Sequence, residues 1–251
     1  MLFIEHNKSN LPTIILLHGG GLSSWALTGI VELLQTDYHV ATPIIDGHGE
    51  DGGTDFISIE DSSQKLIEYI DTQCNRKVFA LGGLSIGAQI VLETLNQRED
   101  IAQFVILESA LVLPIIGTKV LTVPAIKLSY GLLKQKWFSK MQAKTLYVAE
   151  NMLERYYRDS LKISKKSLVN MVLSNGTYRL KINVAKTQAK VLIIAGEKEI
   201  GLIKKSAKLL HDKIPNSVLH ISPRKKHGEL SMSYSTEYVK IMNDFFGDKQ
   251  M

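Results

Sequence analysis

Residues 78–96 read VFALGGLSIGAQIVLETLN, which is an apolar run, a glycine-rich turn and a second apolar segment. The run predicts a buried strand over Val78–Leu81, and the second segment predicts a helix from Ile86 to about Asn96. At the turn, Ser85 has one glycine two residues before it and another two residues after it. A sharp strand-to-helix turn brings those two positions almost into contact, so both must be very small. The alternative is an ordinary glycine-rich turn with an idle serine, which this strand-to-helix context disfavours.

The same alternation of apolar runs with amphipathic segments extends from this unit in both directions. Further buried strands are predicted over residues 13–17, 38–45, 104–107, 190–195 and 217–221. Helices are predicted over residues 23–35, 58–74, 202–213 and 231–246. Strands that alternate with helices indicate an α/β fold, with a mostly parallel central sheet flanked by helices.

The alternation of strands and amphipathic segments stops after Ser109 and resumes near Lys190. We therefore expect an α/β core made of residues 1–109 and 190–251, with a helical cap, or lid, inserted over residues 110–189 after the strand that ends near Glu108. Within the insertion, helices are predicted over residues 144–159 and 164–174. The apolar stretch 111–133 contains two prolines and two glycines, which predict interruptions.

Composition narrows the class of protein. The chain has 251 residues, of which 45% are hydrophobic and 22% charged, and this balance excludes global disorder. No apolar stretch is long enough for an ordinary spanning helix, and the N-terminus lacks the pattern of a secretory signal. The single cysteine, Cys74, cannot form an internal disulfide. These features predict a cytoplasmic protein without stable membrane insertion.

The net charge of +5 hides an uneven distribution. Residues 110–189 carry 14 lysines and arginines against 3 acidic residues, whereas the rest of the chain carries 16 against 22. The ordinary interpretation is a set of solvated helix faces. Of the two sharper alternatives, attraction of an anionic substrate or acidic carrier is preferred over docking on an anionic membrane, because proline and glycine interrupt the apolar stretch. No nucleic-acid-binding motif is present, and no nucleic acid partner is expected.

A second glycine-rich motif, His18-Gly19-Gly20-Gly21, follows the strand predicted over residues 13–17. Together with the Gly-Leu-Ser85-Ile-Gly turn, it resembles the α/β-hydrolase family, in particular the carboxylesterase and lipase-like serine hydrolases with a helical cap. The resemblance implies an oxyanion hole made by the backbone amides of Gly20 and Ile86. It also implies structural roles for His18 and for His48, which lies in a stretch similar to the family's Pro-Gly-His-Gly with Asp in place of Pro.

The resemblance also implies the partners of Ser85. His227, followed by glycine in a loop after the last predicted strand, matches the position of the family's catalytic base. The third member is expected a few residues after the next-to-last strand. There the sequence Gly-Glu-Lys-Glu places Glu199 where aspartate is usual, so a Ser-Glu-His triad is expected. Glu108 is the alternative acid, at the end of a neighbouring strand, and Glu197 is a third candidate.

The function implied by this resemblance is hydrolysis of a carboxylic ester or thioester with a small to medium acyl group, anionic substrates included. A serine nucleophile forms an acyl-enzyme without any cofactor or metal. Amides and carbon–carbon bonds remain open as substrates, and so does the oligomeric state. Apolar residues of the insertion could line an acyl pocket, or could only bury the cap: they are Leu111, Leu113, Ile115, Ile116, Val120 and Leu121. The alternative function is a hydrolase-fold receptor that binds a small ligand with little turnover.

Overall fold

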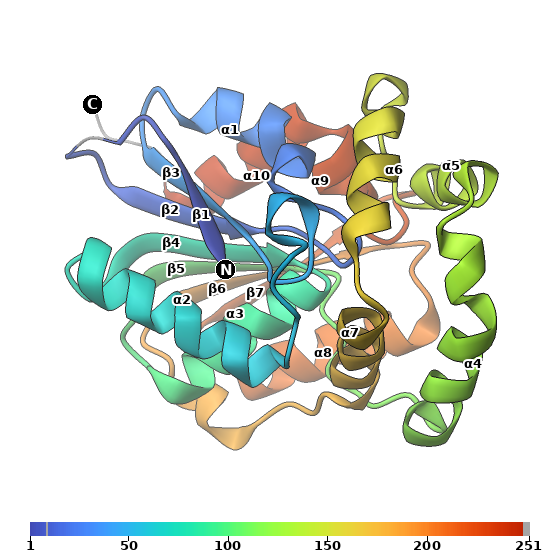
Figure 1. Cartoon of the computed structure of the whole chain (residues 1–251). Helices are drawn as coiled ribbons and strands as arrows, with labels where there is room; N and C mark the ends of the chain where they lie inside the picture. The colour runs from blue at the N-terminus through green and yellow to red at the C-terminus, as the bar shows by residue number, and fades with distance from the viewer. Residues whose placement is uncertain (9, 248–251) are drawn as a thin grey trace.

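The central sheet is seen in a computed structural model that describes residues 1–8 and 10–247 (Figure 1). Its strands are β1 (Leu2–His6), β2 (Thr13–Leu17), β3 (His39–Ile44), β4 (Val78–Leu84), β5 (Ala102–Glu108), β6 (Lys190–Gly196) and β7 (Ser217–Ser222). They are ordered β1-β3-β2-β4-β5-β6-β7, and only β1 pairs antiparallel with its neighbour. The mostly parallel sheet predicted from the sequence is confirmed. The edge strand β1 was not predicted, because its polar residues mask the pattern of a buried strand.

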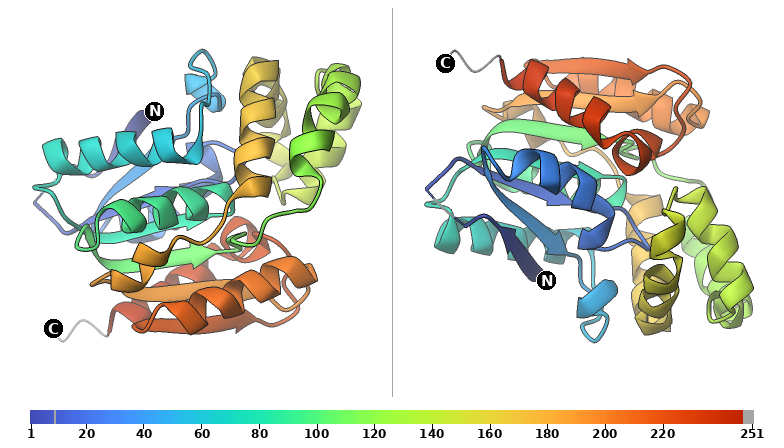
Figure 2. Two further views of the ribbon diagram at one scale, coloured as in Figure 1. Left: turned by 90° about the horizontal axis from the view of Figure 1, so that it is seen from below. Right: turned by 90° about the horizontal axis from the view of Figure 1, so that it is seen from above.

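Helices cover both faces of the sheet (Figure 2). One face carries α1 (Thr28–Leu34), the short α9 (Glu229–Ser233) and α10 (Ser235–Phe246), and the other carries α2 (Ile59–Gln73), α3 (Ile86–Gln97) and α8 (Gly201–Lys213). Successive side chains of β2 enter opposite cores: Ile14 and Leu16 pack with α1 and α10, whereas Ile15 and Leu17 pack with α2, α3 and α8. Because a strand alternates its side chains, a sheet buried on both faces needs continuous apolar runs, as the sequence has.

The segment between β5 and β6 forms a separate group of helices at the carboxyl ends of the parallel strands (Figure 1). This group contains α4 (Thr118–Leu133), α5 (Lys136–Thr145), α6 (Leu153–Lys162) and α7 (Lys165–Thr177), with the 3₁₀ turn η3 (Glu150–Met152). The last 3₁₀ turn of the segment, η4 (Ile182–Lys186), packs on α3 instead. A cluster of buried apolar residues joins this insertion to the core: Ala143, Val148 and Tyr156 pack with Leu22, Trp25 and Leu84. The insertion therefore lies over the edge of the sheet where the predicted site residues emerge.

Two expectations for the insertion were wrong. The helix predicted over residues 144–159 is split, because α5 ends at Thr145 and Tyr147 adopts a left-handed φ of 57°. Conversely, α4 is continuous through Pro124, which predicted an interruption. Proline removes one helical hydrogen bond, and both Pro124 and Val120, whose carbonyl would accept that bond, are exposed to water. Solvation of the freed carbonyl lets the helix continue.

Candidate active site

Ser85 lies at the turn from β4 into α3, with φ 55° and ψ −114°. A Cβ atom on Gly83 would lie 2.4 Å from the backbone carbon of Gly87, and one on Gly87 would lie 2.6 Å from the carbonyl oxygen of His18. Neither position has room for a side chain, as the sequence pattern predicted. Backbone hydrogen bonds hold the strained conformation: the amide of Ser85 donates to the carbonyl of Glu108 at 2.9 Å, and the amide of Gln89 donates to the carbonyl of Ser85 at 3.1 Å. The Ser85 hydroxyl lies at the N-terminal end of α3, where the helix dipole favours negative charge.

A chain of contacts connects Ser85 to a histidine and then to a carboxylate. The Oγ atom of Ser85 lies 3.1 Å from Nε2 of His227, and Nδ1 of His227 lies 3.1 Å from Oε2 of Glu199. Each residue follows a different parallel strand, namely β4, β7 and β6. The carboxyl ends of these strands meet at one edge of the sheet. His227 and Glu199 are 142 and 114 positions away from Ser85 in the chain, yet His227 comes within hydrogen-bond distance of both other residues.

The charge of Glu199 acts on the His227 ring. Burial opposes protonation of the imidazole, but the hydrogen bond to Glu199 and its negative charge outweigh burial, so the pKa of His227 lies above its ordinary value. The Glu199 side chain is almost fully buried, and that of His227 is 43% exposed. The ring can therefore exchange a proton with solvent or substrate while the buried carboxylate orients it.

The two other candidate acids point elsewhere. Glu108 is buried and accepts a hydrogen bond from the backbone amide of Ser231 at 3.3 Å, and burial raises its pKa to about 7. Glu197 accepts a hydrogen bond from the backbone amide of Arg224 at 2.7 Å. Of the three carboxylates, Glu199 is the one within hydrogen-bond distance of His227 in the described structure.

Ser109 belongs to the same network, and the sequence analysis gave it no role. Its hydroxyl donates to Oε1 of Glu199 and accepts from the backbone amide of Gly228, the residue after His227. Its φ of 55° turns the chain sharply at the end of β5. The available signal was its place one residue beyond a strand that neighbours β4 and β6, because side chains there share the edge with Ser85 and Glu199.

Gly20 and Ile86, whose backbone amides are the predicted oxyanion donors, line the same cavity as Ser85. Ile86 is the first residue of α3, where amides have no acceptor within the helix. A Cβ atom on Gly20 would lie 3.2 Å from the Met171 sulfur, so this strand-to-loop turn is covered by α7. The role of the two amides as an oxyanion hole, which the resemblance implied, stays a prediction.

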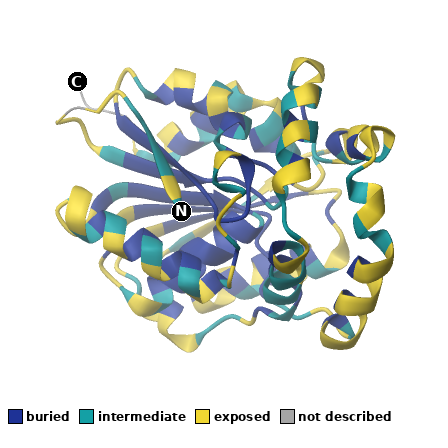
Figure 3. Cartoon of the chain, in the orientation of Figure 1, coloured by how far each residue is buried: buried dark blue, intermediate teal, exposed yellow. Residues whose placement is uncertain are grey.

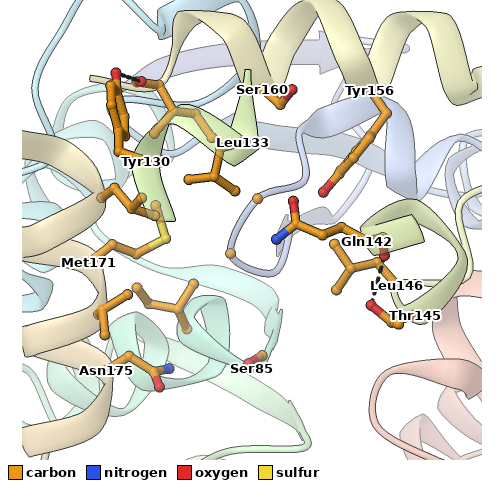
Figure 4. A pocket seen from close by; sticks show the side chains of 16 residues that line it. Ser85, Tyr130, Leu133, Gln142, Thr145, Leu146, Tyr156, Ser160, Met171 and Asn175 are labelled. Carbon is orange, nitrogen blue, oxygen red and sulfur yellow. Dashed lines mark hydrogen bonds between the residues drawn. The ribbon is translucent and has the colours of Figure 1, made fainter. Parts of the chain in front are cut away.

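The cavity has a volume of about 360 Å³ and lies between the Ser85 turn and the insertion (Figure 4). It is lined by Gly20, Gly21, Ser85, Ile86, Tyr130, Leu133, Gln142, Thr145, Leu146, Tyr156, Ser160, Ile163, Leu168, Met171, Val172 and Asn175. None of these residues carries a formal charge. Of the two alternatives left open for the apolar residues between 111 and 121, lining of this pocket does not hold, because none of them is among its lining residues. Leu111 is buried, whereas Ile115, Ile116, Val120 and Leu121 are exposed.

Two other histidines near the site have structural contacts, as expected. The His18 ring is fully buried, its Nδ1 donating to the carbonyl of Gly19 at 2.8 Å and its Nε2 accepting from the amide of Ile45 at 3.1 Å. Burial lowers its pKa to about 3, so the ring is neutral at physiological pH. His48 is also buried and bonds the carbonyl of Asp46 at 3.0 Å. Both rings support loops at the edge of the sheet.

The sequence pattern of a known family, described as serine aminopeptidase, S33, matches residues 8–230, which is most of the chain. The chain belongs to the serine aminopeptidase S33 family. Comparison with curated protein sequences finds no match. As a member of this family the chain is an α/β hydrolase, which agrees with the strand order and with the turn at Ser85.

Solved structures share the fold of this S33 family member. A thermophilic esterase from Thermogutta terrifontis is 15% identical, with a TM-score of 0.74 over 98% of this chain and 93% of the other. A bromoperoxidase from Bacillus anthracis is 19% identical, with a TM-score of 0.79 over 98% and 95%. An esterase from Exiguobacterium antarcticum is 16% identical, with a TM-score of 0.79 over 97% and 94%. At such identities the likeness shows the α/β-hydrolase fold alone.

Proposed function

We propose that this α/β hydrolase cleaves a carboxylic ester or thioester through an acyl-enzyme formed on Ser85. The observation that carries the proposal is the unbroken series of contacts from Ser85 through His227 to the buried Glu199. A serine hydroxyl is a weak nucleophile until a base takes its proton, and an oriented imidazole is the usual base. The Glu199 carboxylate accepts a hydrogen bond from Nδ1–H of His227 and so stabilises that tautomer of the ring. Nε2 then faces the hydroxyl of Ser85 and can accept its proton.

In the proposed reaction, the Ser85 oxygen attacks the substrate carbonyl as His227 takes its proton. The negative charge that develops on the carbonyl oxygen is stabilised by the backbone amides of Gly20 and Ile86. His227 then gives the proton to the leaving alcohol or thiol, and the acyl group stays on Ser85. A water molecule, activated by the same imidazole, attacks the acyl-enzyme and releases the acid, which restores the Ser85 hydroxyl.

The cavity supports a small to medium acyl group. Its lining is mainly apolar side chains from the insertion, such as Leu133, Leu146, Leu168 and Met171, and no lining residue is charged. An uncharged acyl chain gains most from burial against such a surface, because burying an unpaired charge is costly. A charged group on the substrate therefore belongs on the leaving group, outside this cavity.

The test is turnover of chromogenic esters and thioesters of increasing acyl length by the purified chain. Wild-type protein should turn over short and medium acyl chains and lose rate with long ones, because the cavity volume limits the acyl group. A fluorophosphonate should label the wild type at Ser85. Ser85→Ala should abolish both labelling and turnover while the circular dichroism spectrum is retained.

The matched control is Ser129→Ala, which removes a hydroxyl on α4 that donates to the carbonyl of Ala125 at 2.8 Å. It should keep full labelling and turnover. Labelled wild-type protein without turnover of any acyl substrate, combined with tight binding of a small ligand, would replace the esterase proposal by a receptor function. Turnover that persists in Ser85→Ala would refute the assigned nucleophile.

A further inference from the structure

The outer side of α4 is apolar although it faces solvent. Between residues 119 and 132, the exposed positions are Lys119, Val120, Leu121, Val123, Pro124, Ala125, Lys127, Leu128, Gly131 and Leu132, and two of them are charged. The exposed fractions are 75% for Val120, 63% for Leu121 and 88% for Leu128. In Figure 3 the helix at the edge of the molecule farthest from the sheet is exposed along most of its length. A surface helix of a globular protein normally presents polar residues on this side.

Exposed apolar residues continue beyond α4 at both ends. Ile116, just before the helix, is 99% exposed, and Trp137 and Met141 are exposed on the next helix, α5, which packs against α4. Trp137 and Met141 are one turn apart and lie on one side of α5. We call Ile116, Val120, Leu121, Leu128, Trp137 and Met141 together the outer face. Large apolar side chains exposed along two packed helices are typical of an interaction site.

The chain segment that carries the outer face has charge of one sign. Residues 109–149 contain six lysines and no aspartate or glutamate. Lys134 donates to main-chain carbonyls at the end of α6, and Lys136 pairs with Glu154. Around the ammonium groups of Lys119, Lys127, Lys140 and Lys144, the described part of the chain places no carboxylate within 4 Å. Their charge is therefore available to an external anionic surface.

We infer that the outer face docks on an anionic membrane surface, with its apolar side chains among the lipid headgroups and the lysines at phosphate level. An apolar helix side bordered by lysines, with a tryptophan nearby, combines the two forces that hold interfacial helices: burial of apolar area and attraction to anionic lipid. Among the described residues no helix is long and apolar enough to cross a bilayer, so the contact is peripheral. A second copy of the chain is a poorer occupant, because a two-fold interface would oppose lysines to lysines.

The structure removes the reason for which the sequence analysis preferred attraction of a charged substrate. That preference rested on interruption of the apolar stretch by proline and glycine, but α4 passes through both Pro124 and Gly131 without a break. The opposite side of α4 provides Tyr130 and Leu133 to the cavity wall. Docking would hold this wall against the lipid surface. The docking itself does not depend on the role proposed for Ser85.

The test uses the full chain with Ser85→Ala, so that no lipid is consumed, and vesicles of phosphatidylcholine with or without phosphatidylglycerol. Flotation and the emission of Trp137 report binding, and the shift of Trp137 to shorter wavelength reports entry into lipid; the other tryptophan, Trp25, is buried. Binding to anionic vesicles should exceed binding to neutral vesicles by about tenfold or more and should weaken as salt rises. Leu128→Asp should weaken binding by about tenfold or more, and Lys119→Glu with Lys127→Glu should remove the preference for anionic lipid.

Two matched controls lie away from the outer face. Ile182→Asp changes an 87% exposed apolar residue of η4, which packs on α3, and Lys208→Glu changes a 76% exposed lysine of α8. Both should bind vesicles as the parent does. Equal binding to neutral and anionic vesicles, no binding, or the same loss in the controls would overturn the proposal. Self-association of the parent chain that Leu128→Asp abolishes, without vesicle binding, would identify a second copy as the occupant instead.

Discussion

The hydroxyl of Ser109 donates to the oxygen of Glu199 that does not face His227. Ser109 thereby fixes the carboxylate from one side while the imidazole contacts it from the other. Ser109 also accepts the backbone amide of Gly228, so one buried hydroxyl connects the acid to the loop that carries the histidine. A buried hydrogen bond to a carboxylate is worth more than a neutral one, because the charge strengthens it.

Ser109→Ala should therefore lower kcat by about tenfold to 100-fold, with a smaller change in KM, because Glu199 loses a charge-assisted hydrogen bond of about 1.5–3 kcal/mol. The measurement is steady-state kinetics on the best ester. The matched control is Ser206→Ala, which removes another buried serine hydroxyl, one that accepts a hydrogen bond from the backbone amide of Val112 at 3.1 Å. An equal loss of kcat in both variants would show that Ser109 contributes only to packing and does not position Glu199.

The pH dependence of kcat/KM distinguishes the candidate acids. His227 must be neutral to accept the proton of Ser85, and its pKa is raised by Glu199 against the effect of burial. Activity in the wild type should fall on the acid side at a pH above the ordinary histidine value. Glu199→Gln removes the charge, so the acid limb should move to lower pH and the plateau should fall by about 100-fold or more.

Glu108→Gln is the control for that profile, because Glu108 also raises the pKa of His227, though as a weaker cause. In Glu108→Gln, the acid limb of the kcat/KM profile should move less than in Glu199→Gln, and most of the plateau value of kcat/KM should be retained. The reverse order of the two shifts would make Glu108 the acid partner of His227.

Glu108 should also make stability depend on pH. Its carboxyl has a pKa of about 7 in the folded chain, against an ordinary 4.5, because it is buried. The folded state therefore binds more protons than the unfolded state between these values, and stability falls as pH rises through them. Glu108→Gln should be more stable relative to wild type at about pH 8 than at about pH 4, by up to about 3 kcal/mol, as measured by urea unfolding. A difference that does not change with pH would mean that folding leaves the pKa of Glu108 at its ordinary value.

Gly87→Ala should destabilise the chain by about 2 kcal/mol or more, since the new methyl group would press on the carbonyl oxygens of His18 and Leu17. Gly131→Ala is the matched control, because it lies in α4 with open space around its Cβ position. That variant should be stabilised by about 0.5–1 kcal/mol through helix propensity. Thermal unfolding of the two variants measures both effects. A neutral Gly87→Ala would show that the turn at Ser85 can relax.

The sequence by itself determined the parallel sheet and the turn at Ser85. Continuous apolar runs in β2, β4 and β6 are required of strands buried on both faces, and Gly83 and Gly87 are required where two stretches of backbone touch. These are local constraints, and each leaves a visible pattern in a few adjacent residues. Resemblance in chain order added His227 and Glu199, but left Glu108 and Glu197 open.

Tertiary structure decided what depends on groups distant in the chain. The distances from His227 to Glu199 and from Glu199 to Ser109 arise because β5, β6 and β7 are neighbours in the sheet, which no local pattern encodes. The cavity lining and the exposed side of α4 likewise could not be predicted from the sequence. The same apolar residues occur in a helix whether they face a pocket, a core or solvent. Which side of α4 is covered depends on how it packs against α7, and that is a property of the assembled fold.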